Sequence, residues 1–487
     1  MTNPTPSHVD LQATAKEVMQ QHGFNPDFPA SVTAQLTNLR GQSQITATNG
    51  LPDMRSLLWS SIDNDTSRDL DQIEVAEGFS DGGAKVMIGI ADVDIFVAKL
   101  TPIDQHAARE TTTVYTGICN FPMLPEELST GITSLLEGQD RVSVVIEFLI
   151  DSEGNVKSSD IYRALVRNRA QLQYNSVGAW LEGKAAPPPK VAASGELQRQ
   201  LKLQSDVAQK LKQQRLQHGA LNLQTDEVHP IVLNDTVIEV VKQQKNHATE
   251  LIEDFMVAAN GVVARFLEDV SSLRRIVRTP KRWDRIGQLA AAKGEKLPTQ
   301  PDSKALNDFL LRQKAKDPDH FTDLSLAIIK LIGPGEYVLE RANETAPGHF
   351  GLAVQDYTHS TAPNRRFADV VTQRLIKAKL ARQPNPYSDD ELTTIAANCT
   401  QKEDAARKVE RDMSKRLAAN AMQSRIGESF DAVVTGVTDH GTFVRILKPP
   451  VEGLLAQGAQ GLDVGDKLRA RLIRTDPNRG FVDFARG

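Results

Sequence analysis

Acidic side chains are concentrated in the segment SIDNDTSRDLDQIEVAE, which holds, within twelve residues, Asp63, Asp65, Asp69, Asp71 and Glu74. Carboxylates this close together repel one another unless water or a cation screens them. If the chain around Leu70 is extended, the side chains of Asp69 and Asp71 point the same way, because strand side chains alternate with a period of two residues. Such a group of oxygen atoms suits a hard divalent cation, and we expect Mg²⁺, with Mn²⁺ as an alternative.

Two other interpretations of this segment remain open. In the first, the segment is a calcium-binding EF-hand loop, whose ligand positions 1, 3, 5, 9 and 12 would be Asp63, Asp65, Ser67, Asp71 and Glu74. Arg68 stands where that loop needs glycine, and strand-like sequences flank the segment in place of helices. In the second, the segment is a solvated acidic loop without a chemical role.

A second candidate for chemistry is the segment around Pro363. Proline suits the first turn of a helix, so the sequence predicts a helix that begins here. Arg365 and Arg366 would then face the positive end of the helix dipole, at a cost of about 0.3–1 kcal/mol each. A bound phosphate would relieve this repulsion, since guanidinium groups at a helix N-terminus bind phosphate well. The alternative is a pair of arginines on a solvated helix face.

The net charge of −5 argues against a polycation that coats nucleic acid. The charge is unevenly distributed, because residues 1–150 hold 8 Lys and Arg against 20 Asp and Glu, a net charge of −12, which leaves +7 for the remaining residues. Acid is therefore concentrated around the candidate metal site, although ordinary surface variation also produces such asymmetry.

The cysteines and the apolar runs indicate the compartment. Cys119 and Cys399 are far apart and form no CxxC pair, so neither a disulfide framework nor a thiolate zinc site is indicated. The start MTNPTPSHVDLQ lacks the features of a signal peptide, and no run of about 18 apolar residues follows. We therefore expect a cytoplasmic protein that is neither exported nor inserted in a membrane.

The spacing of apolar residues predicts an α/β fold with three parts. Residues 1–48 are expected to form a small helical domain. Residues 49–426 begin with short apolar runs such as KVMIGIADVDIFVA and RVSVVIEFLI, which predict strands of a mixed sheet, and continue with helices such as HATELIEDFMVAANGVVARFLED and residues 389–425. Residues 427–487 contain short strands separated by Gly, Asp and Pro, which predict a small closed all-β barrel.

Several motifs resemble the ribonuclease II / R family, whose catalytic RNB domain carries a DxxxxxDxDD motif. Asp63, Asp69 and Asp71 match it, whereas Gln72 stands where the family usually has a metal-binding aspartate. The segments Ile90-Ala91-Asp92, NFPMLPEELS and HFGLAVQDYTHSTAPNRRFADVVTQRLI match further family segments, and the last sixty residues resemble the ribosomal-protein S-one type of OB fold. The resemblance covers about residues 50–487. Fewer than sixty residues precede the acidic segment, too few for the two cold-shock barrels of the family.

The resemblance implies roles for individual residues. It assigns metal binding to Asp63, Asp69, Asp71 and Gln72, and catalysis to Asp69, Asp71 and Arg365, with Arg365 stabilising the charge of the transition state. It implies contacts to RNA for Tyr115, Trp283, Arg366, Glu410, Phe443 and Arg445. Trp283 is equally compatible with a buried core position, and Phe443 with the core of the barrel.

The function implied is that of a processive 3′→5′ exoribonuclease that hydrolyses single-stranded RNA to nucleoside 5′-monophosphates with Mg²⁺. The alternative is a catalytically weak RNA-binding protein that retains the fold, and Gln72 is the residue that supports it. A pure RNA binder has no need for clustered carboxylates beside a polyanion, which argues against this alternative. An endonuclease or DNA exonuclease has no matching motif. We expect a monomer that requires no protein partner.

Overall fold

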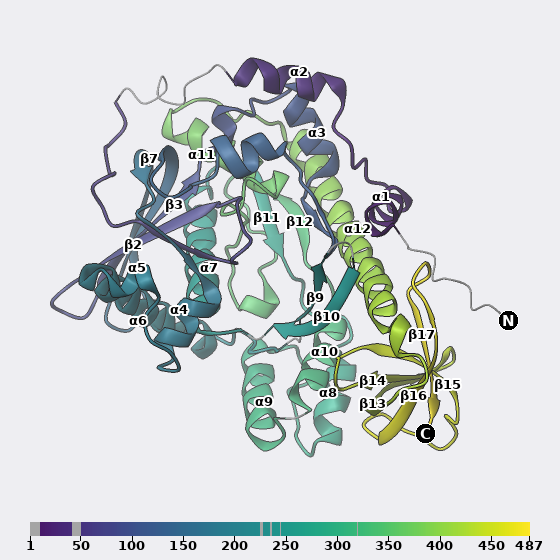
Figure 1. Ribbon diagram of the computed structural model, residues 1–487. Helices are drawn as coiled ribbons and strands as arrows, with labels where there is room; N and C mark the ends of the chain where they lie inside the picture. The colour runs from purple at the N-terminus through teal and green to yellow at the C-terminus, as the bar shows by residue number, and fades with distance from the viewer. Residues whose placement is uncertain (1–9, 41–49, 225–226, 234–235, 244, 319) are drawn as a thin grey trace.

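The computed structural model describes residues 10–40, 50–224, 227–233, 236–243, 245–318 and 320–487. Its central feature is a six-stranded mixed sheet with the order β7-β6-β3-β2-β1-β8 (Figure 1). Only the pair of β1 and β8 is parallel in this sheet. The strands are β1 (Ser60–Asp63), β2 (Gln72–Gly78), β3 (Ala84–Ala91), β6 (Asp140–Ile150), β7 (Val156–Arg167) and β8 (Ala170–Gln173). The predicted mixed sheet is confirmed.

The central strands are apolar throughout because helices cover them. In β3 nearly every side chain is buried, as expected for a strand without a solvated face. Helix α6 (Gly195–Gln217) lies along β2, and α7 (His247–Phe266) contacts β1 and β6. Asn246 begins α7 with a capping box, in which its side chain accepts from the backbone N–H of Thr249 at 3.0 Å. The helix predicted from the HATELIED sequence is therefore confirmed.

Helix α12 (Asp389–Met422) connects the sheet domain to the C-terminal barrel (Figure 1). It has 34 residues and begins with a capping box of Ser388 and Glu391. Its last turns enter the next domain, because Ala419 and Met422 belong to the hydrophobic core of the barrel. This single helix therefore determines the separation between the barrel and the rest of the molecule.

The C-terminal residues form the closed five-stranded barrel that was predicted, with the order β13-β14-β15-β17-β16. Along β14 buried and half-buried side chains alternate, so Val444 and Ile446 face the core while Phe443 and Arg445 face outwards. The strands are β13 (Ser429–Thr438), β14 (Gly441–Ile446), β15 (Glu452–Gln457), β16 (Lys467–Asp476) and β17 (Phe481–Arg486). The outward position of Phe443 leaves its ring accessible to a ligand.

The first two helices lack a core of their own. The buried side chains of α1 (Leu11–Gln21), such as Val18, pack with Val409 of α12. Those of α2 (Ala30–Leu39), such as Leu36, belong to the main core and lie against α3 (Pro102–Glu110). The prediction of helices in this region is confirmed, but the two helices pack on the sheet domain and on α12 and do not form a separate core.

Three helices form a second, smaller core beside the barrel: α8 (Trp283–Ala292), α9 (Ser303–Lys316) and α10 (Phe321–Ile332). Trp283 is part of this core, and its indole N–H donates to the carbonyl oxygen of Pro298 at 2.8 Å. Arg445 of the barrel contacts Asp323 of α10 at 3.4 Å. Of the helices in the described part of the chain, none is long and apolar enough to cross a membrane.

Aromatic side chains support the loop that precedes α11 (Phe367–Leu380). The hydroxyl of Tyr337, on β12 (Glu336–Glu340), and Nδ1 of His359 are 2.7 Å apart. The rings of His349, Tyr357 and His359 meet edge to face, with centroids 5.4 and 5.8 Å apart. Burial and the charges of Arg366 and Arg275 lower the pKa of His359 well below its ordinary value, and burial lowers the pKa of His349 to about 4.

Both histidines are therefore neutral in the folded protein at pH 7, whereas in the unfolded chain they take up protons near pH 6.5. Because the unfolded state binds these protons first, their contribution to the free energy of unfolding falls as the pH is lowered from about 6.5 towards 4. We expect His359→Gln to reduce this dependence by up to about 1.4 kcal/mol per pH unit. Urea unfolding at about pH 7, 6 and 5 measures it.

The matched control is His440→Gln, since His440 is exposed in the turn between β13 and β14. Its pH dependence should equal that of the unchanged protein. If the free energy of unfolding changed equally with pH in all three proteins, the pKa of His359 would not differ between the folded and unfolded states.

Candidate active site

The acidic segment forms an extended loop between β1 and β2 that is attached at several points. The backbone N–H of Leu70 donates to the hydroxyl of Ser134 at 3.0 Å, and the N–H of Leu135 donates to the carbonyl of Leu70 at 3.0 Å. The side chain of Leu70 is fully buried and anchors the loop in the main core. Successive side chains of an extended chain point to opposite sides, so the side chains of Asp69 and Asp71 point away from the core that holds Leu70.

Asp71 contacts the segment that precedes α11, more than 290 residues further along the chain. Its Oδ1 accepts from the backbone N–H of Asn364 at 2.8 Å, and its Oδ2 accepts from Nε of Arg365 at 2.9 Å. The carboxylate is 1% exposed. Burial raises the pKa of Asp71 to about 7, although the charge of Arg365 acts in the opposite direction. The two candidate segments of the sequence therefore form one site.

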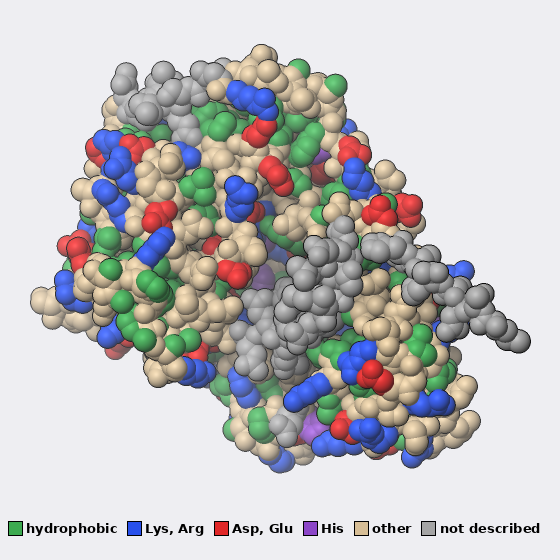
Figure 2. All heavy atoms as spheres, in the orientation of Figure 1, with side chains coloured by type: hydrophobic (Ala, Val, Ile, Leu, Met, Phe, Trp, Pro, Cys, Tyr) green, Lys and Arg blue, Asp and Glu red, His purple; other side chains and the backbone are tan. Residues whose placement is uncertain are grey.

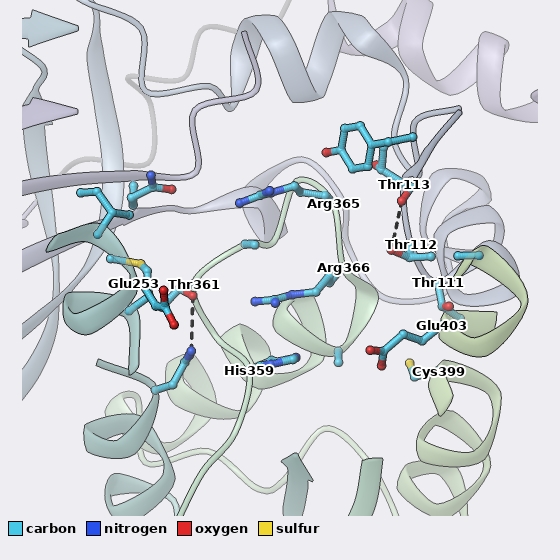
Figure 3. A pocket seen from close by; sticks show the side chains of 18 of the residues that line it. Thr111, Thr112, Thr113, Glu253, His359, Thr361, Arg365, Arg366, Cys399 and Glu403 are labelled. Carbon is cyan, nitrogen blue, oxygen red and sulfur yellow. Dashed lines mark hydrogen bonds between the residues drawn. The ribbon is translucent and has the colours of Figure 1, made fainter. Parts of the chain in front are cut away.

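Arg365 has donors left for a ligand. Only its Nε is used by Asp71, and the side chain is 43% exposed. Burial would lower the pKa of its guanidinium, but Asp71 and Tyr115 raise it further, so the group stays charged. In Figure 3 the guanidinium groups of Arg365 and Arg366 extend side by side into the same cavity. An anion in this cavity would meet two positive charges.

The expected helix start at Pro363 is wrong, because α11 begins at Phe367 and Arg366 is its extended N-cap residue. The repulsion expected between the arginines and the helix dipole is relieved within the protein itself. Asp369 lies in the first turn, fully buried, and accepts two hydrogen bonds from Arg366 at 2.7 and 2.8 Å. The segment before the helix is also tied to its neighbours, since the N–H of Thr113 donates to the carbonyl of Arg365 at 3.0 Å.

Tyr115 lies between the acidic loop and Arg365. It ends the short strand β4 (Val114–Tyr115), which pairs with β5 (Asn120–Phe121), and it is 39% exposed. Burial raises the pKa of Asp69, the charge of Arg365 opposes this shift, and a hydrogen bond to Tyr115 also lowers it. Burial raises the pKa of Tyr115 itself to about 12, so its hydroxyl remains protonated. A phenol ring with an open face thus lies beside the charged groups.

A cavity of about 540 Å³ joins these side chains. Of the residues predicted from the sequence, those that line it are Asp63, Gln72, Tyr115, Arg365, Arg366 and Glu410. Burial raises the pKa of Glu410, and a hydrogen bond from the backbone of Tyr115 partly offsets this increase. Asp71 lies behind this wall, in contact with Arg365. Residues from four distant parts of the chain therefore enclose one chamber.

Some residues lie elsewhere than predicted. Trp283 is outside the cavity, in the core of α8, α9 and α10, which corrects the prediction that it stacks on a base and supports the core alternative. Phe443 and Arg445 are on the outer face of the barrel, and neither lines this cavity. The site itself includes Asn260, Tyr337, His359 and Glu403, which were not predicted. Of these, His359 lies in the HFGLAVQDYTHSTAPNRR segment, six residues before Arg365, so its closeness to the arginines in the sequence could have indicated that it belongs to the site.

Glu403 and Asn260 hold opposite walls of the cavity. Glu403, on α12, accepts from Nη2 of Arg275 at 2.7 Å, and the guanidinium of Arg275 lies 4.8 Å from the centre of the Tyr337 ring. Asn260, on α7, accepts from the backbone N–H and the hydroxyl of Ser360 at 2.9 and 2.8 Å. In Figure 3 Glu403 and Cys399 project from α12 across the cavity from Thr361 and Glu253. These contacts fix the segment that carries both arginines.

The donors near the cavity fit a hard metal ion by their chemistry. Asp63 and Gln72 line the cavity with carboxylate and amide oxygens, and Glu74 on β2 has two buried carboxylate oxygens without a hydrogen-bond partner. Unpartnered buried oxygens of this kind are what a cation site provides. In the described part of the chain no three His, Cys, Asp or Glu side chains are already grouped as a metal site. Each oxygen of Asp71 accepts one hydrogen bond, from Asn364 or from Arg365, and keeps a second lone pair that can bind a cation.

Curated relatives match nearly the whole chain. It is 29% identical to Ribonuclease R of Thermotoga maritima over 94% of its residues, and 30% identical to Ribonuclease R of Escherichia coli over 96%. These matches cover 68% and 61% of the two relatives, so the chain spans about two thirds of their length.

Solved structures show the same fold. Ribonuclease R of Mycoplasma genitalium, in complex with ribose-methylated single-stranded RNA, matches with a TM-score of 0.87 at 23% identity, covering 98% of this chain and 78% of that one. Yeast Ssd1, described as a pseudonuclease, matches with a TM-score of 0.71 at 16% identity, covering 96% of this chain and 58% of that one. The same fold therefore occurs both in a Ribonuclease R and in a protein described as a pseudonuclease.

Two family models match most of the chain, one over the sheet domain with its helices and one over the barrel. Residues 52–382 match the RNB domain, and residues 428–487 match the C-terminal S1 domain of RNase II-type exonucleases. The first range contains the acidic loop, Tyr115 and both arginines, and the second is the closed barrel. The chain therefore belongs to the RNB-domain family of RNase II-type exonucleases.

Proposed function

We propose that this protein is a 3′→5′ exoribonuclease that hydrolyses single-stranded RNA and releases nucleoside 5′-monophosphates one at a time. The observation that carries the proposal is the contact between Asp71 and Arg365 at 2.9 Å, which leaves the other guanidinium donors of Arg365 facing a cavity beside Asp63. A carboxylate group on one side and a guanidinium on the other are the two parts needed to bind and hydrolyse a phosphodiester.

The chemistry follows from these parts. Water adds to the last phosphorus atom and the bond from phosphorus to the 3′-oxygen breaks, so the terminal nucleotide leaves with a 5′-phosphate and the strand regains a 3′-hydroxyl. Arg365 lies where it can stabilise the negative charge that develops on the phosphate, a contribution of about 3–4 kcal/mol for such groups. A divalent cation, which we propose to be Mg²⁺ with Mn²⁺ as a substitute, would be held by Asp63, Asp69, Asp71 and Gln72 and would activate the water.

Side chains around the cavity suit the 3′ end of a single strand. The exposed ring of Tyr115 offers a stacking surface for a base, and Arg366 adds positive charge for a phosphate. Glu410, which lines the cavity next to the backbone of Tyr115, can accept a hydrogen bond from a ribose hydroxyl. Contacts to the 2′-hydroxyl would give preference for RNA over DNA.

The barrel is proposed to hold the strand before it enters the cavity. Figure 2 shows Lys and Arg side chains gathered over the barrel on this face of the molecule. Phe443 and Arg445 face outwards from β14, so an aromatic ring and a positive charge lie close together there. We propose that the protein acts as a monomer in the cytoplasm, a compartment that the free thiols of Cys119 and Cys399 support.

The rival function is that of an RNA-binding protein without hydrolysis, as the pseudonuclease described for yeast Ssd1 illustrates for this fold. Gln72 favours it, because an amide carries no charge for a cation. The retained cluster of Asp63, Asp69 and Asp71 beside Arg365 opposes it, since unneeded carboxylates would repel RNA. A cleavage assay separates the two functions.

Asp71→Asn should abolish hydrolysis, because the neutral amide removes charge from the cation site and releases Arg365. We expect the rate to fall by at least a factor of about 100–1,000, as for the loss of one strong electrostatic group. The measurement follows 5′-labelled single-stranded RNA with Mg²⁺, where the unchanged protein should give a ladder that shortens from the 3′ end. EDTA should stop the reaction.

Asp206→Asn is the matched control, as Asp206 is exposed on α6 and should leave the ladder unchanged. RNA that is bound by the unchanged protein but never shortened, with or without metal, would support the rival and refute the exoribonuclease. Shortening that persists in EDTA would refute the metal-dependent mechanism.

Tyr115→Ala should lengthen the final oligonucleotide that the enzyme leaves, because the strand loses a stacking surface worth about 1–3 kcal/mol next to the scissile phosphate. Tyr115→Phe keeps the ring and removes only the hydroxyl, so its final product should be that of the unchanged enzyme. Denaturing gels at long reaction times compare the three limit products. Identical products for Tyr115→Ala and the unchanged enzyme would show that the ring does not hold the 3′ end.

A further inference from the structure

Glu74 is a carboxylate enclosed in the protein without a hydrogen-bond partner. It lies on β2, its exposure is 0%, and neither of its oxygens accepts a hydrogen bond. Ser60, directly opposite it on β1, is also fully buried with an unpartnered hydroxyl. An unsatisfied buried polar group costs about 1–3 kcal/mol, and a charged one costs more. The oxygens of Glu74 are therefore available to a ligand.

The position of Glu74 connects it to the cavity. Residues on a strand alternate between faces, so Glu74 and Gln72 share one face of β2, and Gln72 lines the cavity. Asp63, at the end of β1, lines the same cavity. Glu74 pairs with Ser60 across β2 and β1, and Asp63 follows Ser60 by three residues at the end of β1, so adjacent strands carry the two carboxylates.

The oxygens of Asp71, another carboxylate of the cluster, already accept hydrogen bonds. Asp71 uses one oxygen for Asn364 and the other for Arg365. Gln72 contributes an amide oxygen but no charge. Asp63, at the end of β1, accepts one hydrogen bond, from the backbone N–H of Asn64 at 3.0 Å, and it lines the cavity. A divalent cation bound beside Asp63 needs a second carboxylate there.

We propose that Glu74 is that second charge, and that Glu74 and Asp63, with the amide oxygen of Gln72, hold a divalent cation beneath the cavity. The proposal rests on the function proposed above and adds a residue to its metal site. It accounts for a fully buried carboxylate whose oxygens bond to nothing else, and for the use of a neutral residue at position 72 in a metal-dependent family. Hard carboxylate and amide oxygens are the ligands that Mg²⁺ and Mn²⁺ prefer.

The opposing explanation is that Glu74 is a buried acid that stays protonated and has no ligand. In that case glutamine, which has the same shape and no charge, would replace it without loss of metal binding. The two explanations therefore predict different behaviour of a single substitution.

The experiment titrates the purified full chain with Mn²⁺ alone and measures binding by calorimetry, without RNA or turnover. We expect Glu74→Gln to weaken Mn²⁺ binding at least tenfold. Glu77→Gln is the matched control, because Glu77 lies on the same strand, its side chain is 64% exposed, and it pairs with Lys85 at 3.0 Å. Its affinity for Mn²⁺ should equal that of the unchanged protein.

A second variant makes the test independent of how well Glu74→Gln folds. Gln72→Asp in the Glu74→Gln background returns one negative charge to the same face of β2 and should restore Mn²⁺ binding to within threefold of the unchanged protein. If Glu74→Gln fails to fold, Glu74→Asp keeps the charge but shortens its reach, and it should also weaken binding at least tenfold.

The outcomes separate this inference from the proposed function. Mn²⁺ binding that is unchanged in Glu74→Gln, or in Glu74→Asp where that variant is used, overturns the role of Glu74, while metal-dependent shortening of RNA by the unchanged protein would keep the exoribonuclease intact. Failure of the double variant to regain binding overturns the claim that the charge on this face is what holds the ion. An unchanged protein that neither binds Mn²⁺ nor shortens RNA overturns both.

Discussion

The pairing of a buried carboxylate with a guanidinium, Asp71 with Arg365, is the interaction on which the site depends. It joins two segments 294 residues apart, and both are held from behind. The loop of Asp71 is attached through Leu70 to Ser134 and Leu135, and the loop of Arg365 through Asn260 to α7. A buried carboxylate without its partner is costly, so the pair ties the position of the arginine to that of the acidic loop.

Much of the fold was predictable because its signals are local. The strands β3 and β6, the helices α7 and α12 and the closed barrel follow from apolar spacing, capping residues and turn residues, and the structure confirms them. The sequence also indicated that the acidic segment and the paired arginines belong to one site. That inference came from the resemblance to the ribonuclease II / R family, which assigns Asp69, Asp71 and Arg365 to one catalytic site.

The remaining features depend on contacts that spacing does not reveal. Helix α11 begins at Phe367, not at Pro363, because Asp369 inside the first turn binds Arg366 and stabilises the later start. Trp283 is in a core because three consecutive short helices bury it, which no motif indicates. The cluster of Tyr337, Tyr357 and His359 combines residues of β12 with the loop before α11, and only the folded chain brings them together.

Helix α12 fixes the distance between the cavity and the barrel. Glu403 and Glu410 face the cavity, and Ala419, nine residues after Glu410, is already in the barrel core. Each residue of an α-helix advances about 1.5 Å along the axis and turns by about 100°. The nine residues from Glu410 to Ala419 therefore set the distance between the cavity and the barrel, about 14 Å along the helix, and the orientation of the barrel about the helix axis. An insertion or deletion in this stretch would therefore change both the distance and the orientation of the barrel relative to the cavity.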